Sequence, residues 1–121
     1  MQRILVVDDS ASVREALVTL FAAEGYDARG ARNGREALRL LRGGFRPSLV
    51  VLDMMMPQMD GWDFRRAQRR DPALADIPVI ILTAVVNPML EARKLRAVAG
   101  FRKPLDVYAL LEVVSDHCPL R

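Results

Sequence analysis

Four short segments of this chain lead from mainly apolar residues into a reactive side chain. They are residues 4–7 before Asp8 and Asp9, residues 49–52 before Asp53, residues 79–82 before Thr83, and residues 101–102 before Lys103 and Pro104. Apolar runs of this length, bounded by polar and turn residues, are typical of buried parallel strands. Because parallel strands all point the same way, the side chains at their carboxyl ends meet in one crevice. The sequence therefore predicts that three carboxylates, a hydroxyl and an ammonium group lie close together.

Strand and helix patterns alternate along the chain, which predicts a doubly wound α/β fold. The expected strands are residues 3–7, 27–31, 49–52, 79–82 and 100–102, with 27–31 as a weak strand at an edge. The expected helix starts are Ser10 or Ser12, Asn33-Gly34, the residues after Gly61, Asn87-Pro88 and Asp106. Five such units with a site at the strand tips match the flavodoxin-like strand order 2-1-3-4-5.

Each expected helix has an apolar face that can cover the sheet, and the first helix should stop at Gly25. The residues assigned to these faces are Val13, Leu17, Leu20 and Phe21; Ala37, Leu38 and Leu41; Trp62, Phe64 and Ala67; and Val107, Leu110, Leu111 and Val114.

A cluster of three carboxylates needs a positive partner, because two unit charges about 4 Å apart repel by roughly 4 kcal/mol at an effective dielectric constant of about 20. Carboxylate ligands without His or Cys suit Mg²⁺, with Mn²⁺ as an alternative ion. A divalent cation, the Lys103 ammonium and the Thr83 hydroxyl together provide what the oxygens of a phosphoryl group need during transfer. One carboxylate can then act as the nucleophile and become an aspartyl phosphate.

The order and spacing of these residues resemble those of the receiver domain of bacterial two-component response regulators. Within that family, the chain is most similar in form to the stand-alone chemotaxis type. The resemblance covers essentially the whole chain. It rests on Asp8-Asp9, Asp53 with Met54-Met55-Met56-Pro57, Met59-Asp60-Gly61, Thr83-Ala84 and Lys103-Pro104. The intervals of 44 residues from Asp9 to Asp53 and of 30 residues from Asp53 to Thr83 also fit the family.

The resemblance implies a role for each acidic residue. Asp53 is expected to be the phosphorylated residue. Asp8, Asp9, Asp53 and the backbone carbonyl of Met55 are expected to bind Mg²⁺, Asp8 either directly or through water. The plainer alternative is that Asp8 and Asp9 cap the helix that follows them and that Asp53 caps its own loop.

The resemblance also implies roles for the residues after the last two strands. Thr83 and the backbone of Ala84 are expected to hydrogen-bond to phosphoryl oxygens. Lys103 is expected to pair with the phosphoryl group, and the peptide bond between Lys103 and Pro104 is expected to be cis. Lys103 is one of only two lysines in a chain that contains sixteen arginines. A lysine in a chain that otherwise uses arginine fits a site that needs a compact point charge instead of the planar fork of Arg.

Length and composition predict one domain over residues 1–121 without a separate effector domain, and the resemblance implies that this is a receiver domain. With 51% hydrophobic residues the chain can build a core, but no apolar stretch reaches membrane-spanning length. The first apolar run is too short for a secretory signal, and the single cysteine, Cys118, excludes an intramolecular disulfide. A cytoplasmic location is the expectation.

The resemblance implies a phosphoacceptor in two-component phosphorelay signalling rather than an enzyme. A histidine kinase or a histidine phosphotransfer protein would be the donor, and a downstream protein would recognise the switched surface. Two alternatives remain open at this point. One is an interaction module of the same fold that works without phosphate. The other is an aspartyl-phosphate hydrolase of the haloacid dehalogenase type, although Asp8-Asp9-Ser10 lacks the Asp-x-Asp motif of that class.

Arginines give the chain a net charge of +3. One group of arginines recurs at helical spacing and is assigned to the second helix, namely Arg35, Arg39, Arg42 and Arg46. A second group clusters on the third helix and consists of Arg65, Arg66, Arg69 and Arg70. The simple interpretation is a solvated face. The more specific hypothesis is an acidic protein partner for the second and third helices, in preference to nucleic acid.

Two features depart from the family pattern. The interval of 20 residues from Thr83 to Lys103 is short for the family, which predicts a shortened fourth helix or following loop, and Gly100 stands where members commonly carry an aromatic residue. Phe101 is one residue further along the strand and should face the opposite side. In addition, Met55 and Val85 occupy positions where polar side chains of family members can help to place water.

Overall fold

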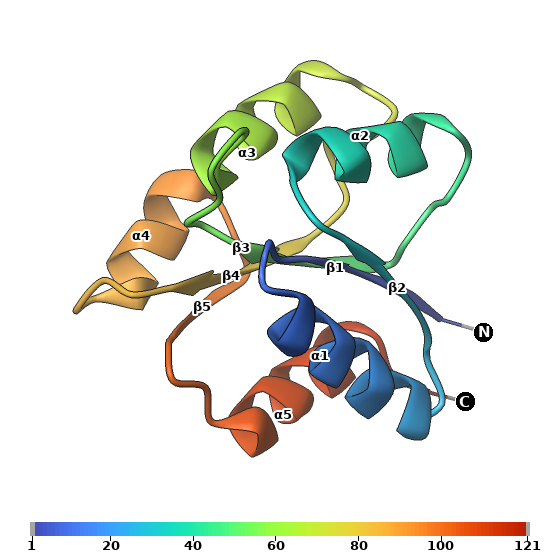
Figure 1. The fold of residues 1–121 in the computed structure, drawn as a ribbon, viewed down its shortest axis with the longest axis vertical. Coiled ribbons are helices and arrows are strands. Elements are labelled where there is room, and N and C mark those ends of the chain that lie inside the picture. Colours follow the sequence, from blue (N-terminus) through green and yellow to red (C-terminus); the bar gives the residue numbers. More distant parts are fainter. Residues whose placement is uncertain (1, 121) are drawn as a thin grey trace.

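Five parallel strands form the centre of the computed structural model, which describes residues 2–120 (Figure 1). The strands are β1 (Arg3–Val7), β2 (Asp27–Ala31), β3 (Leu49–Asp53), β4 (Val79–Thr83) and β5 (Ala99–Arg102). Their order in the sheet is β2-β1-β3-β4-β5, which confirms the predicted flavodoxin-like topology. As expected, β2 lies at an edge, and the more apolar strands β1, β3 and β4 occupy the interior.

The strand register brings the predicted site residues to one edge. Val7 pairs with Leu52, Asp53 with Leu82, and Thr83 with Arg102. Asp53 and Thr83 are thus the last residues of β3 and β4, one residue beyond the predicted strand ends. Asp8 and Lys103 directly follow β1 and β5, so all four residues lie at the carboxyl edge of the sheet.

Within residues 2–120 a helix follows each strand: α1 (Ala11–Ala23), α2 (Gly34–Arg42), α3 (Gly61–Arg70), α4 (Pro88–Leu95) and α5 (Val107–His117). Side-chain oxygens accept hydrogen bonds from the first turn of each helix and so fix where it begins. The capping residues are Ser10, Asn33, Asp60, Asn87 and Asp106. Helix α1 ends at Ala23, and Gly25 follows with a φ of 104°, a left-handed conformation that glycine adopts readily.

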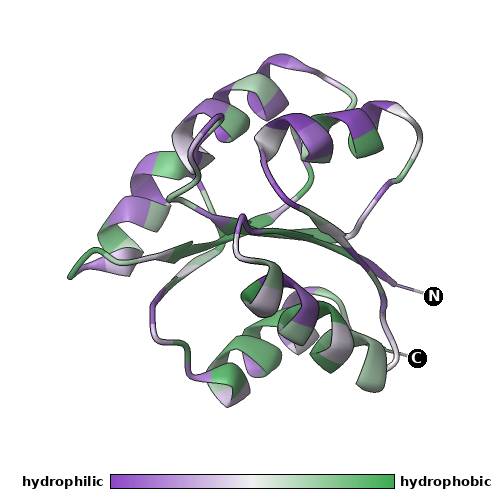
Figure 2. Cartoon of the chain, viewed as in Figure 1, coloured by the Kyte–Doolittle hydropathy of each residue, from purple (hydrophilic) through white to green (hydrophobic). Residues whose placement is uncertain are grey.

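The helices cover the two faces of the sheet, with α1 and α5 on one side and α2, α3 and α4 on the other (Figure 1). Each side has its own core cluster, the first including Phe21 and Leu110 and the second including Leu41 and Phe64. Figure 2 shows hydrophobic strands at the centre, whereas α2 and α3 are mainly hydrophilic on their outer surfaces. None of the helices in residues 2–120 is both long and apolar enough to cross a membrane.

Three predicted details are wrong. Helix α2 ends at Arg42, so Arg46 lies beyond it, where its guanidinium donates a hydrogen bond to the carbonyl of Leu41. Val107 is exposed, although Leu110 and Val114 on the same face of the helix are buried, because it is the first residue of α5. Arg65 is buried and does not belong to the solvated face of α3.

Candidate functional site

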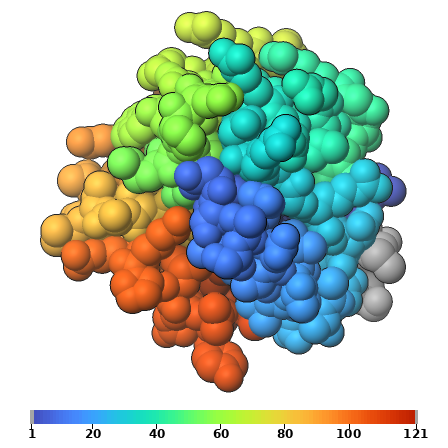
Figure 3. Space-filling view, viewed as in Figure 1, coloured from blue at the N-terminus to red at the C-terminus, as the bar shows by residue number. Residues whose placement is uncertain are grey.

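Asp8, Asp9 and Asp53 form a compact acidic cluster at the carboxyl edge of the sheet. One carboxylate oxygen from each lies within 4.8 Å of those of the other two. Asp8 and Asp53 are buried, and Asp9 is exposed at the mouth of the cluster. In Figure 3 the blue segment after β1 lies next to the green segment after β3, although 44 residues separate Asp9 from Asp53 in the sequence.

The backbone at the strand ends holds two of these carboxylates in place. The N–H of Ser10 donates to Oδ1 of Asp8 at 2.9 Å, and the N–H of Met55 donates to Oδ1 of Asp53 at 3.2 Å. The guanidinium of Arg14 donates to the carbonyl oxygen of Asp8 at 2.9 Å. Because each anchored carboxylate has a second oxygen, the cluster can still bind an external cation.

Lys103 bridges the two buried carboxylates. Its Nζ lies 3.3 Å from Oδ2 of Asp8 and 3.3 Å from Oδ1 of Asp53. Burial alone would lower the pKa of Lys103, but the nearby charges of Asp53 and Asp8 outweigh it and raise that pKa overall. Lys103 therefore remains protonated, and it supplies one positive charge for three carboxylates.

The surroundings of Asp53 change the pKa of its carboxyl group. The pKa of Asp53 is raised from 3.8 to about 6, chiefly by burial and in addition by the neighbouring charge of Asp8. The N–H of Met55 and the ammonium of Lys103 act in the opposite direction. Ionised Asp53 is thus held in an environment that favours the binding of a further positive charge.

The residues at the carboxyl ends of β4 and β5 complete this edge of the sheet. Thr83 is buried, and its Oγ1 accepts a hydrogen bond from the N–H of Val85 at 3.3 Å. The backbone N–H of Lys103 donates to the carbonyl of Thr83 at 2.8 Å, which ties the Lys103 loop to β4. Ala84 is exposed next to Thr83, and the Lys103–Pro104 peptide bond is cis, as predicted.

The donor set fits a magnesium ion. Three carboxylates converge from two neighbouring strands, and among the described residues the only ammonium in contact with them is that of Lys103. This excess of negative charge attracts a divalent cation, and hard oxygen ligands match the preference of Mg²⁺. Asp9 can reach such an ion from the solvent side, and Asp8 and Asp53 from the buried side.

Residues 4–115 match the sequence pattern of the "Response regulator receiver domain" family. The chain belongs to this family. Membership agrees with the acidic pocket, and it places the chain among the phosphoacceptor domains of two-component signalling, rather than among the hydrolases considered as an alternative.

Two named proteins with similar sequences agree with this family assignment. The "Sporulation initiation phosphotransferase F" of Bacillus subtilis (strain 168) is 36% identical over 122 residues, which cover 99% of this receiver chain and 96% of that protein. The "Probable transcriptional regulator ycf27" of Porphyra purpurea is 46% identical over 84 residues, or 69% of this chain. The match spans 33% of that longer protein, so the chain corresponds to about a third of the first such relatives.

A solved structure of a response regulator bears on the metal. Response regulator protein TrrA from Thermotoga maritima, solved in complex with Mg²⁺-BeF, is 33% identical to this receiver. The two structures superpose with a TM-score of 0.83 over 97% of this chain and 99% of the other. A homologue of the same fold therefore holds Mg²⁺ together with a beryllofluoride group.

Gly100 and Phe101 face opposite sides of β5, as predicted. Phe101 packs partly buried on the α1 and α5 side of the sheet. A Cβ atom on Gly100 would lie 2.4 Å from the carbonyl oxygen of Pro88, because the start of α4 packs directly against β5. This receiver thus has no room for an aromatic side chain at position 100, and the Phe101 ring is not directed toward Thr83.

Two polar residues connect α3 to its neighbours, and the sequence analysis missed Gln68 altogether and the burial of Arg65. Gln68 is buried and donates from Nε2 to the carbonyls of Leu74 and Ile77. Arg65 is also buried and holds α3 against the end of α4. The available signal was helical spacing, since both residues fall on the face that contains buried Phe64.

Proposed function

We propose that Asp53 accepts a phosphoryl group from a histidine kinase or a histidine phosphotransfer protein. One oxygen of the Asp53 carboxylate forms a bond to phosphorus while the bond from phosphorus to the donor histidine nitrogen breaks. The electron pair of the broken bond stays on the imidazole. On this proposal the chain assists its own phosphorylation and is not an enzyme acting on an external substrate.

The observation that carries this proposal is the position of the Asp53 carboxylate. It is buried at the end of β3, with Lys103 Nζ at 3.3 Å and two further carboxylates beside it. Asp8, Asp9, Asp53 and the Met55 carbonyl would hold Mg²⁺, which neutralises charge on the transferred group when it is bound. Lys103, the Thr83 hydroxyl and the backbone N–H of Ala84 would bind the phosphoryl oxygens. Phosphorylation by acetyl phosphate, with Asp53→Asn as the comparison, tests the proposal.

The site should bind Mg²⁺ with modest affinity, because few protein ligands are available and water must complete the coordination shell. Asp9→Ala should weaken this binding by roughly tenfold or more, since a direct ligand matters at least as much as the groups that support ligands. Asp9 is exposed, so its removal should leave the fold intact. Isothermal calorimetry or NMR titration measures the effect.

The matched control for the metal titration is Asp76→Ala, which removes an exposed carboxylate at the other end of β4. This variant should bind Mg²⁺ as the wild type does. Unchanged Mg²⁺ binding in Asp9→Ala, or no binding to the wild type, would contradict the proposed metal site.

The aspartyl phosphate should be long-lived. Hydrolysis needs a water molecule in line with the bond to Asp53, and an acid or amide side chain can orient it. Met55 and Val85 are exposed beside the site and offer only apolar side chains. Combining Met55→Asn with Val85→Glu should accelerate loss of phosphate by roughly tenfold, within the range of general base effects. Phosphate loss after removal of excess donor measures the rate.

For the decay experiment, Val86→Glu introduces the same charge one residue further from Thr83, at a strongly exposed position. That variant should lose phosphate at the wild-type rate. An equal acceleration in Val86→Glu would mean that added negative charge, and not an oriented water, controls the rate.

The output of the switch would pass from Thr83 into α4. Exposed apolar side chains continue from the loop after β4 onto this helix, namely Val85, Val86, Met89 and Leu90. A phosphoryl group held by Thr83 would shift an existing equilibrium of this loop and so change the surface available to a downstream protein. The same proposal places the chain in the cytoplasm as one receiver domain. A chain that signals without phosphate would instead present this surface unchanged after treatment with a phosphodonor.

A further inference from the structure

Charge is divided unequally between the two helical layers. Helices α2, α3 and α4 together contain nine basic and three acidic residues, whereas α1 and α5 together contain one arginine and three acidic residues. The layers lie on opposite sides of the sheet (Figure 1). A net charge of +3 for the whole chain therefore hides a strongly basic face that opposes a weakly acidic one.

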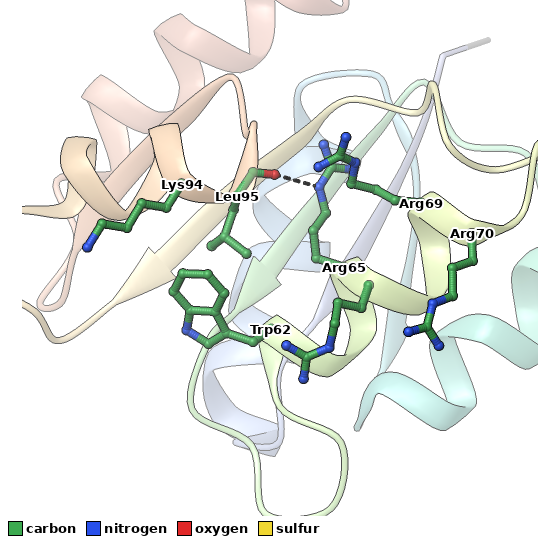
Figure 4. A pocket seen from close by; sticks show the side chains of 7 residues that line it. Trp62, Arg65, Arg69, Arg70, Lys94 and Leu95 are labelled. Carbon is green, nitrogen blue, oxygen red and sulfur yellow. Dashed lines mark hydrogen bonds between the residues drawn. The ribbon is translucent and has the colours of Figure 1, made fainter.

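A groove of about 420 Å³ lies between α3 and α4 within the basic layer. Its walls are Trp62, Arg66, Arg69 and Arg70 from α3 and Lys94 and Leu95 from α4. In Figure 4, Trp62 lies between the two helices, Lys94 extends from α4, and Arg70 lies further along α3. The groove thus combines an indole ring with cationic groups on both sides.

Arg65 fixes the geometry of this groove from below. Its buried guanidinium donates to the carbonyl of Leu95 at 2.9 Å (Figure 4). It also donates to the carbonyl of Arg96 at 2.9 Å and to Oε1 of Gln68 at 2.8 Å. These bonds join α3 to the C-terminal end of α4. Because all three guanidinium nitrogens of Arg65 donate hydrogen bonds to neighbouring groups, this residue contributes rigidity to the groove.

Most of the other cations in the groove lack an ionic partner. Within residues 2–120, no carboxylate lies within 4.0 Å of the charged nitrogens of Arg69, Arg70 or Lys94. Arg66 pairs with Asp63, and Glu91 of α4 lines the adjoining hollow that also contains Trp62. Three unneutralised positive charges around a half-buried indole ring favour a ligand that carries several negative charges and an apolar group.

We propose that this groove binds an acidic segment of a partner protein. An apolar side chain of the segment rests on Trp62 and Leu95, and flanking carboxylates pair with Arg69, Arg70 and Lys94. Duplex nucleic acid fits less well, because α3 lies between α2 and α4 (Figure 1) and cannot enter a major groove as a recognition helix does. The groove is present in the unphosphorylated chain, so this binding can be tested without a phosphodonor.

Trp62 is the only tryptophan of the chain, so its fluorescence reports directly on the groove. The probe is a synthetic glutamate-rich peptide with one central phenylalanine and no tryptophan, titrated without Mg²⁺. It should produce a saturable change in Trp62 fluorescence, with an affinity that falls as salt rises. Exchanging the phenylalanine for alanine should weaken binding, because the apolar contact with Trp62 is lost.

Charge reversal at Arg69→Glu with Arg70→Glu should weaken peptide binding by about tenfold, since two attractive groups become repulsive. Both residues are exposed, and circular dichroism verifies the fold. The matched control is Arg35→Glu with Arg39→Glu, the same charge change on α2 outside the groove. The control should retain affinity within about twofold.

Three results would overturn the proposal. The first is an equal loss of affinity in both charge-reversed variants, which would indicate general attraction by the basic face. The second is a failure of the apolar contact, seen either as unchanged Trp62 fluorescence on adding the peptide or as equal affinity for the peptides with phenylalanine and with alanine. The third is tighter binding of a short DNA duplex than of the peptide, which would assign the basic face to nucleic acid.

Discussion

Replacing Asp53 by asparagine should abolish covalent phosphorylation of this receiver. With acetyl phosphate and Mg²⁺, the wild-type chain should gain one phosphoryl group, because the site itself holds the charged groups that a donor needs. The asparagine side chain keeps the shape of the aspartate but offers no carboxylate nucleophile. Intact-mass spectrometry should therefore show one added phosphoryl group in the wild type and none in Asp53→Asn.

The control for this experiment is Asp76→Asn, which changes an exposed aspartate remote from the site in the same way. It should be phosphorylated like the wild type, and removing Mg²⁺ with a chelator should suppress the reaction in both. A phosphoryl group that persists in Asp53→Asn would assign the acceptor to another residue. Wild type that stays unmodified would favour an interaction module that works without phosphate.

Asp53→Asn should also stabilise the metal-free protein above pH 7. The pKa of Asp53 rises from 3.8 to about 6 on folding, chiefly through burial, so ionisation costs more in the folded state than in the unfolded chain. This cost is absent below pH 3.8, grows as the pH rises, and is complete above pH 6. Asn carries no such cost, so the variant should gain up to about 3 kcal/mol in the free energy of unfolding.

Urea unfolding of both proteins between pH 4 and pH 8, without Mg²⁺, measures this difference. The advantage of Asp53→Asn should shrink toward pH 4, and Mg²⁺ should reduce it at pH 8 by stabilising the wild type selectively. Asp76→Asn should show no comparable gain. If Asp53→Asn is no more stable than the wild type at pH 8, the buried carboxylate does not destabilise the folded protein.

The apolar runs and their polar ends were sufficient to predict the parallel strands and the acidic cluster, whereas the strand order came from the match to the flavodoxin-like fold. Burial on both faces requires uninterrupted apolar residues in β1, β3 and β4, and parallel strands must bring Asp8, Asp53 and Thr83 to the same edge. These inferences need only the local pattern and the direction of the strands. The direction of Phe101 followed in the same way, from the twofold alternation of side chains along a strand.

The tertiary structure decided which charges are free and which are engaged. Arg65 and Arg69 belong to the same arginine-rich helix, yet Arg65 is buried against the end of α4 while Arg69 has no ionic partner among residues 2–120. Helical periodicity indicates the face on which a residue lies, but it does not reveal which carbonyls a neighbouring helix places opposite that face. The bridging position of Lys103 and the raised pKa of Asp53 also depend on distances between strands far apart in sequence. The sequence thus determined where the reactive groups converge, and only the packing of helices and loops determined their charge states and contacts.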